Sequence, residues 1–253
     1  MNFLLKAPGI RILKRVRDYI HKPAPLNEFY NYDEYWKNRV SDELTGRYLD
    51  RFSIITKLIG DGESVLDIGC GDCSFQEYLA KTKPKCKSLG LDTSTQAVEL
   101  AKKRNINAKL IDNQRSLAQQ VDSNWNVVTL MEVIEHLPDA ENLVRQVIEL
   151  SPSKIFITIP NIGCMKHRLR LLFGSRFPIT CIYYHMKEHV RFWTVKDFKE
   201  WSETLGLSVQ AVHGQFDHGD SIVEWFVRKF PAMFADRVVY QLVIKQKTST
   251  KHN

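Results

Sequence analysis

The sequence predicts an α/β fold, in which helices cover both faces of a mostly parallel seven-stranded sheet. Strand-like apolar runs alternate with amphipathic helical segments along the chain, which is the pattern of a doubly wound sheet. The first strand of this series ends in a Gly-x-Gly turn, a strand-to-helix connection typical of such folds. The 253 residues, of which 43% are hydrophobic, can bury one good core.

Seven strands and four helices follow from the apolar periodicity. The strands are expected near residues 64–68, 87–91, 107–111, 126–131, 154–159, 207–212 and 237–245. The helices are expected near residues 73–81, 94–104, 139–149 and 194–205. Thr194 is the cap of the last helix and Gly206 its stop. No helix cleanly separates the last two strands, so the final strand is expected to join the sheet antiparallel.

Two connections, residues 161–191 and 213–236, are longer than connections usually are. Long insertions at the carboxyl edge of a parallel sheet are commonly lids or substrate walls. The first contains a helix-like piece, Met165–Leu172, which Gly174 stops, followed by mixed aromatic and basic residues. We expect this insertion to contact an anionic or sugar-bearing substrate, although a packed flap with solvated charges fits the same residues.

The turn after the first strand is the most informative motif of the chain. The strand carries Asp67 and runs into Gly69 and Gly71, and the next strand ends in Asp92. Glycines at such a turn let backbone N–H groups close on a ligand, and a carboxylate one strand later can accept ribose hydroxyls. These features predict a nucleoside-type cofactor. The dinucleotide fingerprint needs a third glycine where this chain has Ser74, which argues against NAD.

This arrangement resembles the S-adenosylmethionine site of class I methyltransferases, over roughly residues 30–245. The resemblance implies a Rossmann-like sheet, whose seventh strand is antiparallel, and S-adenosylmethionine as the cofactor. Cys73 departs from the family, which often has glycine at that position, and Asp92 alone could be a helix cap. The cofactor-binding residues that the resemblance implies are Asp67, Gly69, Cys70, Gly71, Asp92, Thr93, Asp112, Asn113 and Glu132.

A carboxylate–histidine segment follows the fourth strand. If Glu132 to His136 form one helical turn, Glu132, Glu135 and His136 share a face and can converge on a divalent ion. His189, which precedes the last helix, can supply a further ligand. Oxygen-rich ligation with imidazole suits Mg²⁺, Mn²⁺, Fe²⁺ or Co²⁺.

The same segment is similar to two metal-using branches of the family. These are the small-RNA 3′-terminal ribose 2′-O-methyltransferases and the O-methyltransferases of ubiquinone biosynthesis, and both have Glu-x-x-Glu-His here. By analogy, Glu132, Glu135, His136 and His189 would hold the metal, with Mg²⁺ or Mn²⁺ expected. The alternative is a metal-free site, in which His136, His185 or His189 acts as a general base.

The formal charge of +7 is concentrated at the N-terminus. Residues 1–22 are strongly basic, and from Pro8 onward their apolar residues fall on one helical face. Such a helix can rest on an anionic membrane or partner, or it can pack on the domain with its charged side solvated. We divide the chain into this segment, residues 1–25, and a methyltransferase domain, residues 26–253, with the lid insertion at 161–191. The near-neutral remainder argues against an extended nucleic-acid surface.

The cysteines indicate a reducing compartment. Five cysteines are an odd number, and no secretory signal precedes them. We therefore expect a cytoplasmic protein, with peripheral contact to the inner face of the membrane through residues 1–22. Cys70 and Cys73 form a Cys-x-x-Cys pair, but without a second pair a zinc or redox role is not favoured.

Three functions are compatible with these motifs. The first is a methyltransferase acting on a hydroxyl of a small molecule, such as a sugar or glycan. The second is ribose 2′-O methylation at an RNA 3′ end, which shares the ligand set but lacks a recognisable RNA-binding module. The third is a methyltransferase-like binding subunit without catalysis, for which Cys73 is the only support.

Overall fold

A computed structural model describes residues 8–27, 33, 49–122, 124–180, 185–217 and 219–245. Residues 1–7 of the predicted basic segment and 181–184 of the predicted insertion lie outside these ranges.

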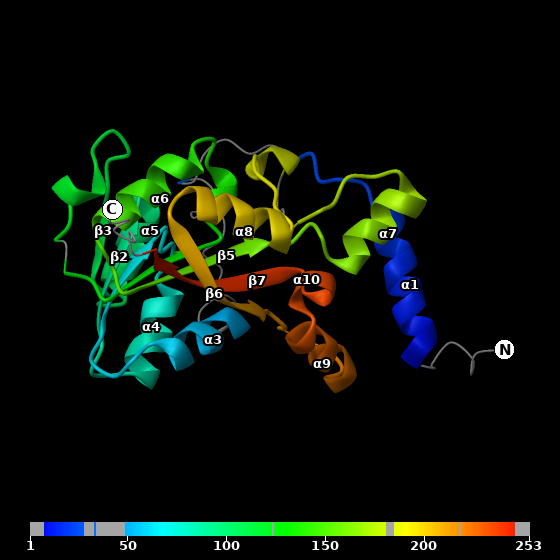
Figure 1. Ribbon diagram of the computed structural model, residues 1–253, viewed down its shortest axis with the longest axis horizontal. Coiled ribbons are helices and arrows are strands. Elements are labelled where there is room, and N and C mark those ends of the chain that lie inside the picture. The colour runs from blue at the N-terminus through cyan, green and yellow to red at the C-terminus, as the bar shows by residue number, and fades with distance from the viewer. Residues whose placement is uncertain are drawn as a thin grey trace, which may run out of the picture.

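The seven predicted strands form one sheet in the order β3-β2-β1-β4-β5-β7-β6 (Figure 1). Their bounds are β1 Ser64–Ile68, β2 Lys87–Asp92, β3 Ala108–Leu110, β4 Val127–Met131, β5 Lys154–Pro160, β6 Leu207–Gly214 and β7 Arg237–Ile244. Strand β7 runs antiparallel to both of its neighbours, and the other neighbouring strands are parallel. The Rossmann-like fold with an antiparallel last strand is therefore confirmed.

The predicted helices are also present. The α-helices are α1 Pro8–His21, α3 Asp50–Leu58, α4 Ser74–Thr82, α5 Thr95–Lys103, α6 Ala140–Glu149, α7 Met165–Gly174, α8 Val195–Thr204, α9 Ser221–Lys229 and α10 Pro231–Phe234. The 3-10 helices are η3 Leu117–Gln119, η4 Ile134–His136 and η5 Met186–Glu188. Thr194 caps α8 as predicted, because its Oγ1 accepts the Asp197 N–H at 3.2 Å. No helix among the described residues is long and apolar enough to cross a membrane.

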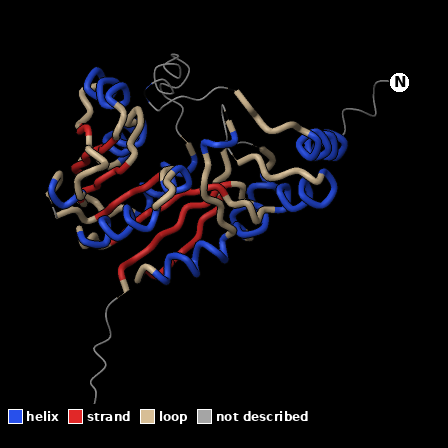
Figure 2. The backbone as a smooth tube through the Cα atoms, turned by 90° about the horizontal axis from the view of Figure 1, so that it is seen from above, coloured by secondary structure: helices blue, strands red, loops and turns tan. Residues whose placement is uncertain are grey.

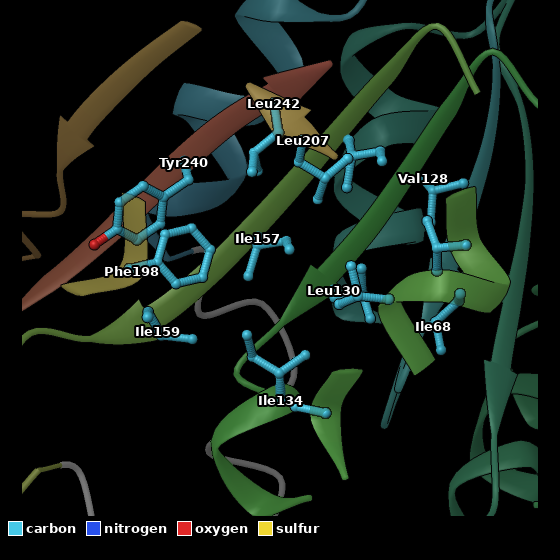
Figure 3. Close-up of a cluster of buried hydrophobic side chains, with 14 of the residues drawn as sticks. Ile68, Val128, Leu130, Ile134, Ile157, Ile159, Phe198, Leu207, Tyr240 and Leu242 are labelled. Carbon is cyan, nitrogen blue, oxygen red and sulfur yellow. The ribbon is translucent and has the colours of Figure 1, made fainter. Parts of the chain in front are cut away.

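Antiparallel pairing of β7 with β5 builds both layers of the core. The register pairs Ile157 with Tyr240, so alternate residues of each strand face opposite sides of the sheet. On one side, Tyr240 stacks on Phe198 of α8 with ring centroids 3.9 Å apart, within the cluster shown in Figure 3. On the other side, Phe156 and Val239 pack with α3 and α4. A shift of one residue would exchange the two faces.

The N-terminal helix packs on the insertion after β5. Helix α1 lies against α7, and its Ile20 is buried while Lys14 and Arg17 are exposed. The buried guanidinium of Arg170 donates hydrogen bonds to three carbonyls at the end of α1, those of Tyr19, Ile20 and Lys22. The last carbonyls of a helix lack partners within it, so Arg170 completes the end of α1, where the Tyr19 carbonyl also accepts the Lys22 N–H at 3.3 Å.

A buried histidine joins the same two helices to the sheet. The ring of His167, on α7, bonds Tyr19 Oη through Nδ1 at 2.5 Å and Asp236 Oδ1 through Nε2 at 2.8 Å. Asp236 immediately precedes β7 and also pairs with Lys166 at 2.6 Å. Helix α1 is therefore held by packing, in line with one of the two roles expected for it.

Replacing Arg170 should release α1 from α7. We expect Arg170→Ala to lower the free energy of unfolding of this helix by about 3 kcal/mol, since three carbonyls, one of them fully buried, lose a charged donor. Hydrogen exchange of residues 8–22 measures the effect. Arg17→Ala is the control, because Arg17 makes only an exposed ion pair with Asp18 and should change stability by less than about 0.5 kcal/mol. Equal protection of α1 in both variants would contradict this role.

Candidate functional site

A cavity of about 770 Å³ lies at the carboxyl edge of the sheet. It borders the loops that follow β1, β2, β3 and β4, and the strand order reverses between β1 and β4. Open α/β sheets bind ligands at this switch point, and the volume is typical of a small-molecule site. All nine residues expected to bind the cofactor, from Asp67 to Glu132, line this cavity, and so do His136 and His189.

The turn after β1 closes because two of its residues lack side chains. Gly69 and Gly71 have φ values of +72° and +54°. A Cβ atom on Gly69 would lie 2.5 Å from Val133 Cγ2, which is closer than real contacts allow. The N–H groups of Gly69 and Cys70 donate to the Leu91 carbonyl at 2.7 and 3.0 Å, so the turn is fastened to β2.

Cys73 fits the turn, although methyltransferases of the class that the chain resembles often have a glycine there. It immediately precedes α4 and has φ +60°, a left-handed value that costs a non-glycine residue of order 1 kcal/mol. Its N–H still donates to the Cys70 carbonyl at 3.0 Å, so the turn keeps its closure. The hydrogen bond from Cys73 and burial raise the pKa of the Cys70 thiol far above its ordinary value. Both thiols are free and buried, which disfavours metal or redox chemistry here.

Asp67 is a buried support of the cavity floor. Its carboxylate accepts hydrogen bonds from Thr129 Oγ1 at 2.5 Å and from Gln76 Nε2 at 2.8 Å. Burial raises the pKa of Asp67 to about 7, although both hydrogen bonds lower it. Sequence reasoning missed Thr129 and Gln76, which belong to β4 and α4 and carry no motif of their own.

Asp92 connects the glycine turn to the next helix. Its Oδ2 accepts the Gly71 N–H at 2.8 Å, and its Oδ1 accepts the Ser94 N–H at 2.9 Å. Burial raises the pKa of Asp92. The cap of α5 is Ser94, whose Oγ accepts the Ala97 N–H at 3.3 Å, so Asp92 itself is not the helix cap.

Asp112 and Asn113 follow β3 on the exposed rim of the cavity. The N–H of Ile111 donates to the Asp92 carbonyl at 2.9 Å, which places this loop beside the end of β2. Gln120, another residue that carries no motif, accepts the Asp112 N–H at 2.8 Å. Thr93, which also lines the cavity, separates Asp92 from Ser94.

The segment after β4 differs from the predicted helical turn. Glu132 has φ +57°, and only Ile134–His136 form a short 3-10 helix. The prediction that Glu132 shares one helical face with Glu135 and His136 is therefore wrong. The carboxylate of Glu132 accepts a hydrogen bond from the Thr158 hydroxyl at 3.0 Å. The backbone N of Glu132 lies 3.1 Å from the same Thr158 Oγ1. β5, which carries Thr158, determines where Glu132 points.

Three of the four predicted metal ligands lie together. One ligand atom each from Glu135, His136 and His189 lies within 4.8 Å of the others, and Glu132 is not part of this group. Neither carboxylate oxygen of Glu135 has a hydrogen-bond partner among the described residues, although the residue is only 1% exposed. Burial, and then the nearby charge of Glu132, raise the pKa of Glu135 well above its usual range.

Both histidines of this group are oriented by their Nδ1 atoms. His136 Nδ1 lies 2.7 Å from the Glu188 carbonyl, and His189 Nδ1 lies 3.0 Å from Thr180 Oγ1. Burial lowers the pKa of both rings, that of His189 to about 3, which leaves neutral imidazoles near pH 7. Hydrogen bonds of this kind orient metal-binding histidines.

The loop that carries His189 is clamped to the segment after β4. The N–H groups of Val190 and Arg191 donate to the Glu135 carbonyl at 2.9 and 3.1 Å. The Arg191 guanidinium bonds the Pro138 carbonyl and both oxygens of Glu141, which also accepts Trp201 Nε1. Burial would raise the pKa of Glu141, but the bonds from Arg191 and Trp201 outweigh it and lower this pKa to about 2. The charge pair therefore persists at neutral pH.

His185, a predicted catalytic candidate, does not line the cavity as described. It caps η5, where its Nδ1 accepts the Lys187 N–H at 3.1 Å and Glu188 bonds its backbone N–H in return. This is a structural position, separate from the pair formed by His136 and His189.

The Glu135 group has the chemistry of a divalent-cation site. Two neutral imidazoles and one carboxylate suit Mn²⁺, Fe²⁺ or Co²⁺, whereas Mg²⁺ prefers oxygen ligands. A buried carboxylate without hydrogen bonds is costly unless it is protonated or neutralised by a cation. Three protein ligands also leave coordination positions for other molecules. The described residues thus fit a transition-metal ion better than Mg²⁺.

Comparisons with solved structures support the fold. A chain from the complex between the Haloferax volcanii Trm112 methyltransferase activator and a methyltransferase superposes with a TM-score of 0.60 at 13% identity, covering 87% of this chain and all of that one. The small RNA methyltransferase HEN1 gives 0.55 at 21% identity, covering 78% of this chain and 25% of its own. The predicted class I S-adenosylmethionine-dependent methyltransferase fold is confirmed.

Sequence comparison gives the family. An enzyme of Nitrosospira multiformis, named ubiquinone biosynthesis O-methyltransferase, is 26% identical over 173 residues, which are 66% of this chain and 70% of the relative. A protein of the same name from Cupriavidus pinatubonensis is 24% identical over 60% of this chain and 63% of its own length. The family model described as "Methionine biosynthesis protein MetW" matches residues 49–242. This match covers well over half of the sequence, and the chain therefore belongs to the MetW family.

Proposed function

We propose that this methyltransferase transfers the methyl group of S-adenosylmethionine to a hydroxyl of a small molecule, with the help of a divalent cation. The observation that carries the proposal is that one cavity joins the glycine-turn residues to His136 and His189. A methyl donor bound beside the glycine turn and an acceptor bound beside the two histidines would therefore share one cavity. The names of the two bacterial relatives, both O-methyltransferases, agree with a hydroxyl acceptor.

At one end, the cofactor would lie across the glycine turn. The Asp92 carboxylate would accept hydrogen bonds from the ribose hydroxyls, since it lies at the end of β2 beside the Gly71 N–H. Asp112 and Asn113 on the rim are the groups to contact the adenine. Asp67 supports the turn from below through its bonds with Thr129 and Gln76.

At the other end, Glu135, His136 and His189 would hold the cation. A bound cation binds acceptor oxygens and lowers their pKa, which makes a hydroxyl a better nucleophile at neutral pH. The chain's own residues contribute position: the Glu188 carbonyl and Thr180 orient the two rings, and Arg191 holds the loop. Methyl transfer in line then depends on the placement of donor and acceptor.

Removal of the Asp92 carboxylate should weaken cofactor binding. We expect Asp92→Ala to lower the affinity for S-adenosylmethionine at least about tenfold, because two ribose hydroxyls lose a charged acceptor. Calorimetry with S-adenosylmethionine and its demethylated product measures this. Asp61→Ala is the control, since Asp61 forms a surface pair with Lys83 outside the cavity. A wild-type chain that binds neither ligand would instead point to a subunit without catalysis.

Substitutions in the Glu135 group should separate metal binding from cofactor binding. Glu135→Gln and His189→Ala should each reduce Mn²⁺ or Co²⁺ affinity by about tenfold or more, as expected for loss of a ligand, and leave S-adenosylmethionine binding intact. Titration with the metal alone, followed by calorimetry with the cofactor, gives both results.

His185→Ala is the comparison for the same experiment. Since His185 only caps η5, its loss should leave metal binding within about threefold of the wild type, apart from a capping cost of about 1 kcal/mol in stability. Methyl transfer that persists in chelator and in Glu135→Gln would rule out the cation and favour His136 or His189 as a general base.

A further inference from the structure

Exposed apolar side chains gather on two parts of the described chain. Of the fifteen exposed large hydrophobic residues there, twelve belong either to residues 165–187 or to residues 221–234, which comprise α9, Phe230 and α10. Leu172 and Phe173 on α7 are 72% and 65% exposed, and Ile222 and Trp225 on α9 are 71% and 55% exposed. Helix α9 buries only Val227, so most of its apolar residues stay exposed, although Trp225 and Phe226 contact each other and Phe230. Patches of this kind usually mark an interaction surface.

These helices lie at one end of the molecule. Figure 1 places α1, α7, α9 and α10 together at the end opposite β3, and α7 contacts both α1 and α10. The perpendicular view in Figure 2 shows the N-terminal helix at the same end. We call the exposed residues of α1, α7, α9, α10 and the described positions 175–187 the basic–apolar surface.

The charge of this surface is mostly positive where α1 meets α7. Residues 161–187 contain five basic residues and no acidic one, and residues 8–22 contain five basic residues and one acidic one. Lys14, Arg17, Arg176 and Lys187 are exposed. Residues 221–234 add aromatic side chains, among them Trp225 on α9 and Phe230 between α9 and α10, which are 55% and 46% exposed. Cationic residues beside exposed aromatic and aliphatic ones are typical of surfaces that bind anionic membranes.

We propose that the basic–apolar surface docks on an anionic lipid bilayer. The phosphate headgroups would pair with exposed basic residues such as Lys14, Arg168 and Arg176. Leu172, Phe173 and Trp225 would enter the boundary with the acyl chains. A second copy of the chain fits less well, because a symmetric interface would face one basic surface with another.

Docking here also suggests the class of acceptor, a point that depends on the proposed function. The insertion that carries Leu172 and Phe173 continues through η5 to His189, which lines the cavity. An acceptor dissolved in the membrane would therefore meet the chain beside the segment that completes the site. We assign the substrate to amphiphilic molecules, in which a hydroxylated head is attached to a lipid-soluble tail.

Vesicle binding tests the surface directly. The full chain is mixed with phosphatidylcholine vesicles that either contain or lack phosphatidylglycerol, and the bound fraction is measured by flotation at low and high salt. We expect binding to the anionic vesicles only, weakened by salt. Lys14→Glu with Arg176→Glu should weaken it at least tenfold, since each basic residue near such a membrane contributes about fivefold. Leu172→Ser with Phe173→Ser should weaken it by about tenfold.

Matched controls come from the opposite end of the molecule. Lys102→Glu with Lys103→Glu on α5, and Leu110→Ser on β3, change exposed residues of the same kinds and should leave binding unchanged. Absence of binding to anionic vesicles, or an equal loss in the control variants, would overturn the proposal. So would a dimer in light scattering that the Leu172 and Phe173 changes dissociate, because the surface would then be an interface between proteins. Calorimetry with S-adenosylmethionine on the same samples separates failure of membrane binding from failure of the proposed function.

Discussion

The candidate site depends on the backbone carbonyl of Glu135. It accepts the N–H groups of Val190 and Arg191, and so fixes the end of the insertion against the segment that follows β4. This contact brings His189 beside His136 and the Glu135 carboxylate, although more than fifty residues separate the two segments in sequence. The ion pair of Arg191 with Glu141 then prevents the loop from turning away, and Trp201 completes the clamp. Tertiary contacts between two loops at one edge of the sheet thus assemble the site.

Much of the fold could be predicted because the strands are short, apolar and separated by glycine or polar turns. The antiparallel last strand was predicted correctly but from a wrong premise, because α9 and α10 do lie between β6 and β7. The register of β5 and β7 shows why this strand is stable: both of its faces bury apolar side chains. Helices α3, α9 and α10 were missed. Helix α9 leaves most of its apolar residues exposed, so its apolar pattern does not mark a buried face from which a helix could be predicted. Helix α10 has only four residues.

The cofactor end of the cavity was predictable because its residues follow strand ends, and parallel strands end together. The supporting contacts were not, since Gln76 and Thr129 reach Asp67 from other elements. The error at Glu132 has a physical cause: the local sequence fits a helical turn, but bonds with Thr158 hold the residue at a positive φ. Cys73 was expected to disturb the glycine turn, but the turn keeps its closing hydrogen bond with Cys73 at a positive φ.

The contacts of His167 and Arg170 alter how the N-terminal helix should be regarded. In a chain shortened to begin at residue 26, the Arg170 guanidinium would keep only the Phe177 carbonyl of its acceptors, and the His167 ring would lose its hydroxyl partner. Solvent reaches both side chains poorly. Removing the N-terminal helix would thus destabilise α7, and with it the insertion that leads to His189. In evolutionary terms, the N-terminal helix and the insertion are expected to be gained or lost together.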